Sequence, residues 1–344
     1  MIDYTNRLIL DCTLRDGGYV NNWEFDTQTA LAVRDALYDS GIRYIELGIM
    51  GNGGVPGKCT KFDHFDQVRP LLAGRKTDCH YCIMFTQAEY ASSGMVLPPC
   101  GPDTVDIIRL AYFKAEKDAA LATAQEMKEK GYTAFLQAMA TFMYSDKELA
   151  AMLEQINAMQ PDAFYMVDSF STMYNENVRH MQQFVLERLD ENILFGFHAH
   201  NNIQMAYSNI ITFVNYPTER PLMMDGSIYG MGRGAGNVPV ELLMEYFNKN
   251  LGAQYKTEIV LDAFARYIEP IFRQNYWGYS MPYLLTASKN CNSVYGWYLG
   301  RKNITGLLDI NKILDRIPEQ AKYTLMRDVI DPIISQYLEE NPHE

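Results

Sequence analysis

The sequence contains no long apolar segment and has fewer basic than acidic residues. No run of about 18 apolar residues occurs among its 344 residues, so we expect no transmembrane helix. The 30 lysines and arginines against 42 aspartates and glutamates give a formal net charge of −12, which argues against nucleic acid or an anionic membrane as the main partner. Residues 1–4 lack a basic region followed by an apolar stretch, so we expect no signal peptide.

Cysteine is also scarce. The six cysteines are scattered, and only Cys79 and Cys82 have CxxC spacing, inside a strand-like run. Because no second CxxC follows, we interpret them as reduced core thiols rather than as a redox or zinc pair. A reduced, cytoplasmic protein is the simplest expectation.

No GxGxxG fingerprint follows the first expected strand, which counts against an open, doubly wound sheet. Short runs rich in Val, Ile, Leu or aromatic residues instead alternate with helical patterns. The expected strands are residues 7–11, 44–48, 80–85, 105–110, 134–140, 163–168, 194–198 and 222–225. They recur about every 25 to 37 residues, the length of one strand-plus-helix unit. The pattern predicts an α/β fold, a (β/α)8 TIM barrel of about 250 residues.

Strands are missing from the last part of the chain. The segments 259–271, 281–288, 310–317 and 323–338 have helical patterns with no strand between them. We therefore predict a catalytic barrel over residues 1–250 and an appended C-terminal helical domain over residues 251–344.

Polar residues gather where two of the expected strands end. The first strand runs into Arg15, Asp16 and a double glycine, and a later strand ends in His198 and His200. Residues two apart on a strand point to the same side, so both histidines can reach one ion. Each histidine alone would be interpreted as a core residue, but two imidazoles with the Asp16 carboxylate form a set typical of a divalent metal site. Oxygen and nitrogen ligands without a thiolate fit manganese, magnesium, cobalt and zinc alike, so the ligands alone leave the identity of the metal open.

Arg15 at such a strand end can stabilise an oxyanion, which predicts a catalytic role. The alternative is a structural ion pair with Glu46, which lies near the end of the second strand. We expect Glu46 to support Arg15 rather than to take part in the chemistry directly.

The glycine-rich segment 225–237, DGSIYGMGRGAGN, follows the last expected strand and closes with Asn237. Glycines allow the backbone to approach a ligand closely, and loops after the seventh and eighth strands of barrels often bind anions. We therefore group Asn237 with Glu46 as substrate-binding candidates and keep a flexible connection as the alternative.

Three motifs together resemble the DRE-TIM metallolyase superfamily. They are TLRDG at residues 13–17, HAHNN at 198–202 and GMGRGAGN at 230–237. This superfamily contains 3-hydroxy-3-methylglutaryl-CoA (HMG-CoA) lyase, isopropylmalate and homocitrate synthases, and 4-hydroxy-2-oxovalerate aldolase. The resemblance implies that Asp16, His198 and His200 are metal ligands and that Arg15 stabilises an enolate. It also implies that Ser169 contacts a pyruvate carboxylate.

Departures from these patterns favour the 4-hydroxy-2-oxovalerate aldolase branch. The synthases usually have LRDGEQ, where this chain has Gly18 and Tyr19, and the CoA lyase has a cysteine in its glycine-rich loop, where this chain has none. The segment GYSMPY at residues 278–283 is similar to GYAGVY of the hydroxy-oxoacid aldolases, whose C-terminal domain is also helical.

The catalytic base is less settled, because the aldolases usually have a histidine where this chain has Tyr19. An ordinary tyrosine has a pKa of about 10 and is a poor base at neutral pH. The resemblance would also fold Tyr283 over the barrel mouth. We hypothesise that Tyr19 or Tyr283 accepts the proton, with a metal-bound water as the alternative.

The sequence thus predicts a divalent-metal-dependent aldolase that cleaves or forms 4-hydroxy-2-oxoacids through a pyruvate enolate and an aldehyde. The alternatives are a Claisen-type acyl-CoA synthase or lyase on the same barrel and a non-catalytic metal-binding partner subunit. The resemblance further implies a homo-oligomer and an aldehyde dehydrogenase as a pathway partner. The aldehyde half of the substrate is left open.

Overall fold

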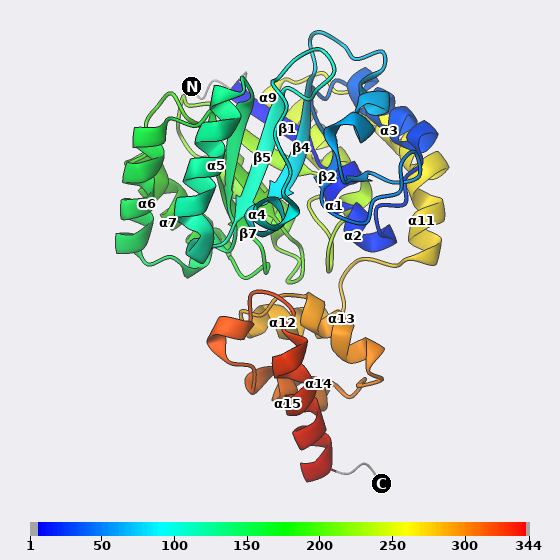
Figure 1. Cartoon of the computed structure of the whole chain (residues 1–344), viewed down its shortest axis with the longest axis vertical. Helices are drawn as coiled ribbons and strands as arrows, with labels where there is room; N and C mark the ends of the chain where they lie inside the picture. Colours follow the sequence, from blue (N-terminus) through cyan, green and yellow to red (C-terminus); the bar gives the residue numbers. More distant parts are fainter. Residues whose placement is uncertain (1–5, 342–344) are drawn as a thin grey trace.

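The computed structural model describes residues 6–341, so residues 1–4, on which the signal-peptide expectation depends, lie outside the described part. Within it, one parallel sheet has the strand order β1-β9-β8-β7-β6-β5-β4-β2-β3, and a further pairing of β1 with β2 closes it (Figure 1). The strands are β1 (Arg7–Asp11), β2 (Tyr44–Met50), β3 (Lys61–Phe62), β4 (His80–Thr86), β5 (Ile107–Tyr112), β6 (Thr133–Ala138), β7 (Ala163–Asp168), β8 (Leu194–Ala199) and β9 (Leu222–Gly226). The predicted TIM barrel is confirmed, with β3 as a short addition beside β2.

Two hydrophobic layers explain why the strands are nearly continuous apolar runs. Along β7, Phe164 and Met166 belong to the layer between sheet and helices, while Tyr165 and Val167 belong to a cluster inside the barrel. Both faces of a barrel strand are covered, so both sets of side chains are apolar. The CxxC cysteines follow the same division, since Cys79 packs in the outer layer and Cys82 inside the barrel.

The helices around the barrel begin and end at the expected kinds of residue. They are α1 (Thr13–Asp16), α2 (Gly18–Asn21), α3 (Thr27–Asp39), α4 (Gln87–Ser93), α5 (Lys117–Glu129), α6 (Asp146–Met159), α7 (Asn175–Leu186), α8 (Ala206–Val214) and α9 (Val240–Leu251). Ser145 and Glu148 form a capping box at the start of α6. Gly41 and Gly131 follow the ends of α3 and α5 with φ of 105° and 88°, a region that glycine enters without strain.

The remaining helices form two groups. They are α10 (Thr257–Ala263), the π-helix η7 (Phe264–Ile268), α11 (Glu269–Gln274), α12 (Met281–Ser288), α13 (Val294–Arg301), α14 (Leu307–Asp315) and α15 (Arg327–Glu340). The expected helix over residues 259–271 is thus divided. Helix α13 was not expected, because Gly296 and Gly300 lower its helix propensity. Gly296 has a packing reason, since a Cβ there would lie 3.2 Å from the Pro282 carbonyl oxygen.

Helices α12, α13, α14 and α15 lie together below the barrel in Figure 1. They share a second hydrophobic core. The core of the barrel continues through α10 and η7 to Trp277, whereas the second core gathers residues from Leu285 onward. Tyr323 in the second unit contacts Phe113 after β5 and Phe170 after β7, with ring centroids 5.8 Å and 6.3 Å apart. The C-terminal helices therefore cover the end of the barrel at which the strands finish. The predicted division of the chain into two domains at residue 250 stays a prediction. Separately, no helix within residues 6–341 has both the length and the apolar character to span a bilayer.

We predict that the second core is a major source of stability for the C-terminal helices. Leu314 is fully buried in it, so Leu314→Ala should lower the free energy of unfolding by about 2–5 kcal/mol through lost packing and the cavity left behind. Leu308 lies on the same helix, 76% exposed, and Leu308→Ala should stay within about 0.5 kcal/mol of wild type. Urea unfolding followed by circular dichroism measures both, and equal losses would contradict this account.

Candidate active site

The chain turns sharply after β1, and this turn places Arg15 and Asp16 at the barrel mouth. The Asp11 carboxylate accepts hydrogen bonds from the Thr13 backbone N–H at 2.8 Å and from its hydroxyl at 3.0 Å, so helix α1 begins directly after the strand. Gly18 follows, and a Cβ there would lie 1.9 Å from the Trp23 ring. The Trp23 indole in turn donates to the Arg15 carbonyl oxygen at 2.7 Å. The double glycine thus allows the close packing that holds this turn.

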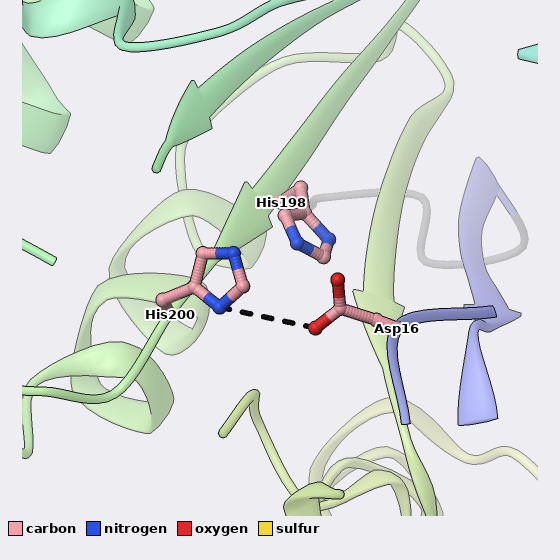
Figure 2. Close-up of side chains that lie close together, drawn as sticks. All are labelled: Asp16, His198 and His200. Atoms are coloured by element: carbon pink, nitrogen blue, oxygen red, sulfur yellow. Dashed lines mark ion pairs between the residues drawn. The ribbon is translucent and has the colours of Figure 1, made fainter. Parts of the chain in front are cut away.

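Asp16, His198 and His200 converge, as Figure 2 shows. Their candidate ligand atoms all lie within 4.8 Å of one another, and each residue is at most 3% exposed. His200 Nδ1 lies 3.9 Å from Asp16 Oδ2, and the centroids of the His198 and His200 rings are 4.9 Å apart. The expected convergence of two imidazoles and one carboxylate is therefore present, while their role as ligands stays a prediction.

The protonation of these groups suits a cation. Although burial raises the pKa of Asp16, the Arg15 guanidinium brings it below its usual range, so the carboxylate is ionised. Burial lowers the pKa of His200 well below its ordinary value, so the imidazole is neutral, the form that binds metals. His200 Nδ1 has no hydrogen-bond partner among the described residues.

Asp225 orients His198. Burial raises the pKa of Asp225, but the Arg109 guanidinium and the hydrogen bond with His198 lower it by more, so the pKa ends below its ordinary value. The carboxylate is therefore ionised and can only accept hydrogen bonds. Its Oδ2 lies 2.8 Å from His198 Nδ1, which therefore carries the proton. The free lone pair of His198 is then on Nε2, an arrangement often found behind metal-bound histidines.

A network of buried ion pairs connects these residues. Glu46 Oε2 accepts from Arg15 Nε at 2.7 Å and from Arg109 Nη1 at 2.8 Å, while Arg15 also pairs with Asp16 and Arg109 with Asp225. Two guanidinium groups and three carboxylates leave one net negative charge in the interior. Because an uncompensated buried charge is costly, the donor set and the net charge both fit a bound divalent cation.

Arg15 forms the ion pair with Glu46 that the sequence offered as one alternative, and its catalytic role stays a prediction. Its Nη2 atom has no hydrogen-bond partner among the described residues. Arg15 lines a cavity at the barrel mouth, hereafter the inner cavity, with Asp16, His198 and His200. One donor of a rigidly held guanidinium is therefore available to a ligand.

The predicted substrate-binding residues lie in different places. Ser169 lines the inner cavity, and its hydroxyl accepts from the Ala140 N–H at 2.9 Å. Glu46 is fully buried behind Arg15, and Asn237 donates to Asp16 Oδ2 at 2.8 Å. Neither Glu46 nor Asn237 lines the inner cavity, so both hold other site residues in position. Their contacts with substrate stay predictions.

The two candidate bases are also separated. Tyr19 lines the inner cavity and a second, outer cavity, whereas Tyr283 lines only the outer one. Burial raises the pKa of each phenol, so both are protonated near neutral pH and are able to donate a hydrogen bond. Tyr19 is 38% exposed, and its ring packs against Trp23 with centroids 4.6 Å apart.

Sequence reasoning missed Arg109, Asp225 and Arg233. Arg109 interrupts the apolar run of β5, and a charged residue inside a barrel strand needs a buried partner, which was a usable signal. Asp225 and Arg233 lie within the glycine-rich segment 225–237, for which the prediction considered the glycine backbone and Asn237 but no other side chain.

Comparisons with known proteins agree with this geometry. The sequence model of a family described as HMGL-like matches residues 7–266. A 4-hydroxy-2-oxovalerate aldolase from Pelotomaculum thermopropionicum is 27% identical over 283 residues, 77% of each chain. An oxaloacetate decarboxylase from Mycobacterium tuberculosis is 24% identical over 242 residues, 69% of this chain and 68% of that one.

Solved structures share the fold. The N-terminal domain of a candidate aldolase from Bacteroides vulgatus has a TM-score of 0.72 and 28% identity, and the match covers 86% of this chain and 98% of that chain. An HMG-CoA lyase from Bacillus subtilis has a TM-score of 0.61 at 15% identity, over 77% of this chain and 93% of that chain. At such low identity the second match shows the fold alone.

We predict that the histidine pair holds one divalent ion per chain. The double variant His198→Ala/His200→Ala removes both imidazoles, so elemental analysis after dialysis should show loss of the metal while circular dichroism shows an intact fold. His180→Ala is the matched control, because the His180 side chain on α7 is 68% exposed and does not line the inner cavity, so this variant should keep full metal content. Full metal content in the double variant would contradict the assignment.

Proposed function

The chain belongs to the HMGL-like family of the DRE-TIM superfamily, and we propose that it is a divalent-metal-dependent aldolase that cleaves or forms 4-hydroxy-2-oxoacids. Family membership and the relatives named as aldolases and as a decarboxylase indicate a carbon–carbon lyase. The observation that carries the proposal is the meeting of Asp16, His198 and His200 with a free Arg15 nitrogen in one buried cavity.

Asp16, His198 and His200 would hold the metal, for which we propose manganese. When bound, a divalent ion supplies Lewis-acid polarisation of the 2-oxo group of the substrate. The ionised Asp16 and the neutral His200 are ready to bind it without first losing a proton.

Cleavage breaks the bond between carbons 3 and 4 of the oxoacid. The proton of the 4-hydroxyl leaves to a base, the oxygen becomes the aldehyde carbonyl, and the electron pair of the broken bond forms the pyruvate enolate. The free Nη2 of Arg15 donates a hydrogen bond to the enolate oxygen, and Glu46 holds the guanidinium in place. Protonation of the enolate at carbon 3 then gives pyruvate.

Tyr19 is the group that we propose for the proton at the 4-hydroxyl. It lines the inner cavity beside Arg15, and its protonated phenol can donate to the aldehyde oxygen in the condensation direction. In cleavage the phenolate form of the same group accepts that proton, because the two directions share one transition state.

Decarboxylation of oxaloacetate is a second candidate, favoured by the Mycobacterium tuberculosis relative. There the bond to the terminal carboxylate breaks, carbon dioxide leaves, and the same electron pair forms the same enolate beside Arg15. This reaction needs no base at a 4-hydroxyl. Consumption of oxaloacetate that survives Tyr19→Phe would support it, and turnover of an acyl-CoA would instead support the Claisen-type alternative.

We predict that the shape of Arg15 matters as well as its charge. Arg15→Lys keeps the positive charge but loses the planar fork that binds Glu46 and the oxyanion together. Turnover of pyruvate with an aldehyde should fall by about 100- to 1000-fold, the usual effect of losing one oxyanion donor. Metal content, measured in parallel, should stay near wild type, and nearly full activity would leave only a general charge effect for Arg15.

We predict that Tyr19 rather than Tyr283 moves the proton. Phenylalanine keeps the ring and removes only the hydroxyl, so Tyr19→Phe should lower turnover by about 100-fold or more with unchanged metal content. Tyr283→Phe is the matched control, because Tyr283 lines only the outer cavity, and its turnover should fall far less. If both variants turn over like wild type, a water molecule performs the transfer.

A further inference from the structure

A second, outer cavity lies between the barrel mouth and the C-terminal helices. Its volume is about 360 Å³. Its walls combine the barrel loops with the later helices, and they include Tyr19, Arg233, Tyr276, Trp277, Tyr283 and Trp297. The outer cavity is thus rich in aromatic side chains and contains a single cationic side chain among its lining residues.

The outer cavity adjoins the inner one. Tyr19 and Arg233 line both cavities, so they mark the boundary between them. A substrate whose oxoacid end lies beside Arg15 would therefore extend past these two residues. A volume of several hundred Å³ is typical of sites for ligands much larger than a two-carbon aldehyde.

Arg233 lies at this boundary, and its guanidinium has no partner among the described residues that explains its position. Its side chain is partly buried, yet among residues 6–341 its guanidinium makes no ion pair or hydrogen bond. It lies over the Tyr19 ring, 5.2 Å from the ring centroid, and its charge helps to lower the pKa of the Asp16 carboxyl. The backbone holds it close to the metal site, because the Arg233 N–H donates to Asp16 Oδ2 at 3.3 Å. A Cβ at the neighbouring Gly232 would lie 2.5 Å from the same oxygen, so only glycine permits this approach.

A guanidinium in a partly dry site is complementary to a carboxylate or a phosphate, which its planar fork binds with two parallel hydrogen bonds. The other arginines of the site, Arg15 and Arg109, are already paired with carboxylates. Arg233 therefore has its full binding capacity left for a ligand.

The aromatic walls add a second requirement. Trp297 is 48% exposed and Tyr276 is 70% exposed, although large aromatic side chains are usually more deeply buried. Ser293 and Asn275 place polar groups among them. Such walls suit a ligand body with both apolar and polar faces.

Resting on the proposed aldolase function, we propose that the outer cavity binds the aldehyde half of the substrate and that Arg233 selects aldehydes that carry an anionic group, a phosphate or a carboxylate. The carboxylate of the oxoacid half has other polar groups available in the inner cavity, namely Ser169, Thr86 and Gln137. Arg233 thus sets specificity for the second substrate rather than for pyruvate.

The test uses pairs of aldehydes that differ in one charged group. The holoenzyme condenses pyruvate with glyceraldehyde 3-phosphate or glyceraldehyde, and with succinic semialdehyde or butanal, and kcat/KM is measured for each. Arg233→Met should lower kcat/KM for the charged member of the preferred pair by about 10- to 100-fold, the scale of a lost hydrogen bond to a charged group. The kcat/KM for the uncharged aldehyde of the pair and the KM for pyruvate should change little. The pair with the larger effect identifies phosphate or carboxylate as the anion.

Two control variants accompany it. Arg179→Met removes an exposed arginine on α7, outside both cavities, and should leave all values unchanged. Trp297→Ala removes an aromatic wall without touching the charge, so it should weaken both members of a pair to a similar extent. Equal losses for charged and neutral aldehydes in Arg233→Met, or a raised KM for pyruvate alone, would overturn the proposal.

Binding separates failure of this inference from failure of the aldolase function. Glycerol 3-phosphate and glycerol cannot react, and their binding can be followed by the fluorescence of Trp277 and Trp297 in the cavity wall. If no aldehyde reacts, the aldolase proposal fails, but a preference for glycerol 3-phosphate that Arg233→Met abolishes still supports the anion site. Equal binding of both compounds by wild type and variant overturns it.

Discussion

The buried ion-pair network at the barrel mouth is the constraint on which the site depends. It joins residues from five different strands or the loops after them, namely Arg15, Asp16, Glu46, Arg109, His198 and Asp225. Removing such charges from water costs several kcal/mol for each ion, and only good geometry offsets that cost. The closed barrel provides this geometry, because pairing of β1 with both β2 and β9 brings the ends of the chain's first and last strands together.

Within this network, residues of the same chemical type have different roles. Glu46 is shared by two arginines, which leaves one Arg15 nitrogen free, and Asp225 sets the tautomer of His198. Glu46, Arg109 and Asp225 do not line the inner cavity, yet they decide which atoms of Arg15 and His198 face it. The net negative charge of the network provides the electrostatic reason for a cation at Asp16.

The C-terminal helices give the mouth its second wall. Tyr323 contacts Phe113 and Phe170, which follow β5 and β7, and Tyr283 and Trp297 line the outer cavity together with Arg233. The inner cavity is built from the barrel alone, whereas the outer cavity needs both units. The proposed chemistry therefore rests on the barrel alone, whereas the proposed aldehyde site draws on both units.

The sequence by itself determined the alternation of strands and helices, and with it the barrel, because parallel strands buried on both faces are apolar runs of a recognisable length. It also determined which residue types stand at the strand ends, so Arg15, Asp16, His198 and His200 could be named from local patterns. Only the tertiary structure decided that Arg109 pairs with Asp225, 116 residues away, and that Tyr19 rather than Tyr283 lines the inner cavity. The physical reason is that such contacts depend on closure of the barrel and on the position of the C-terminal helices, which no local pattern specifies.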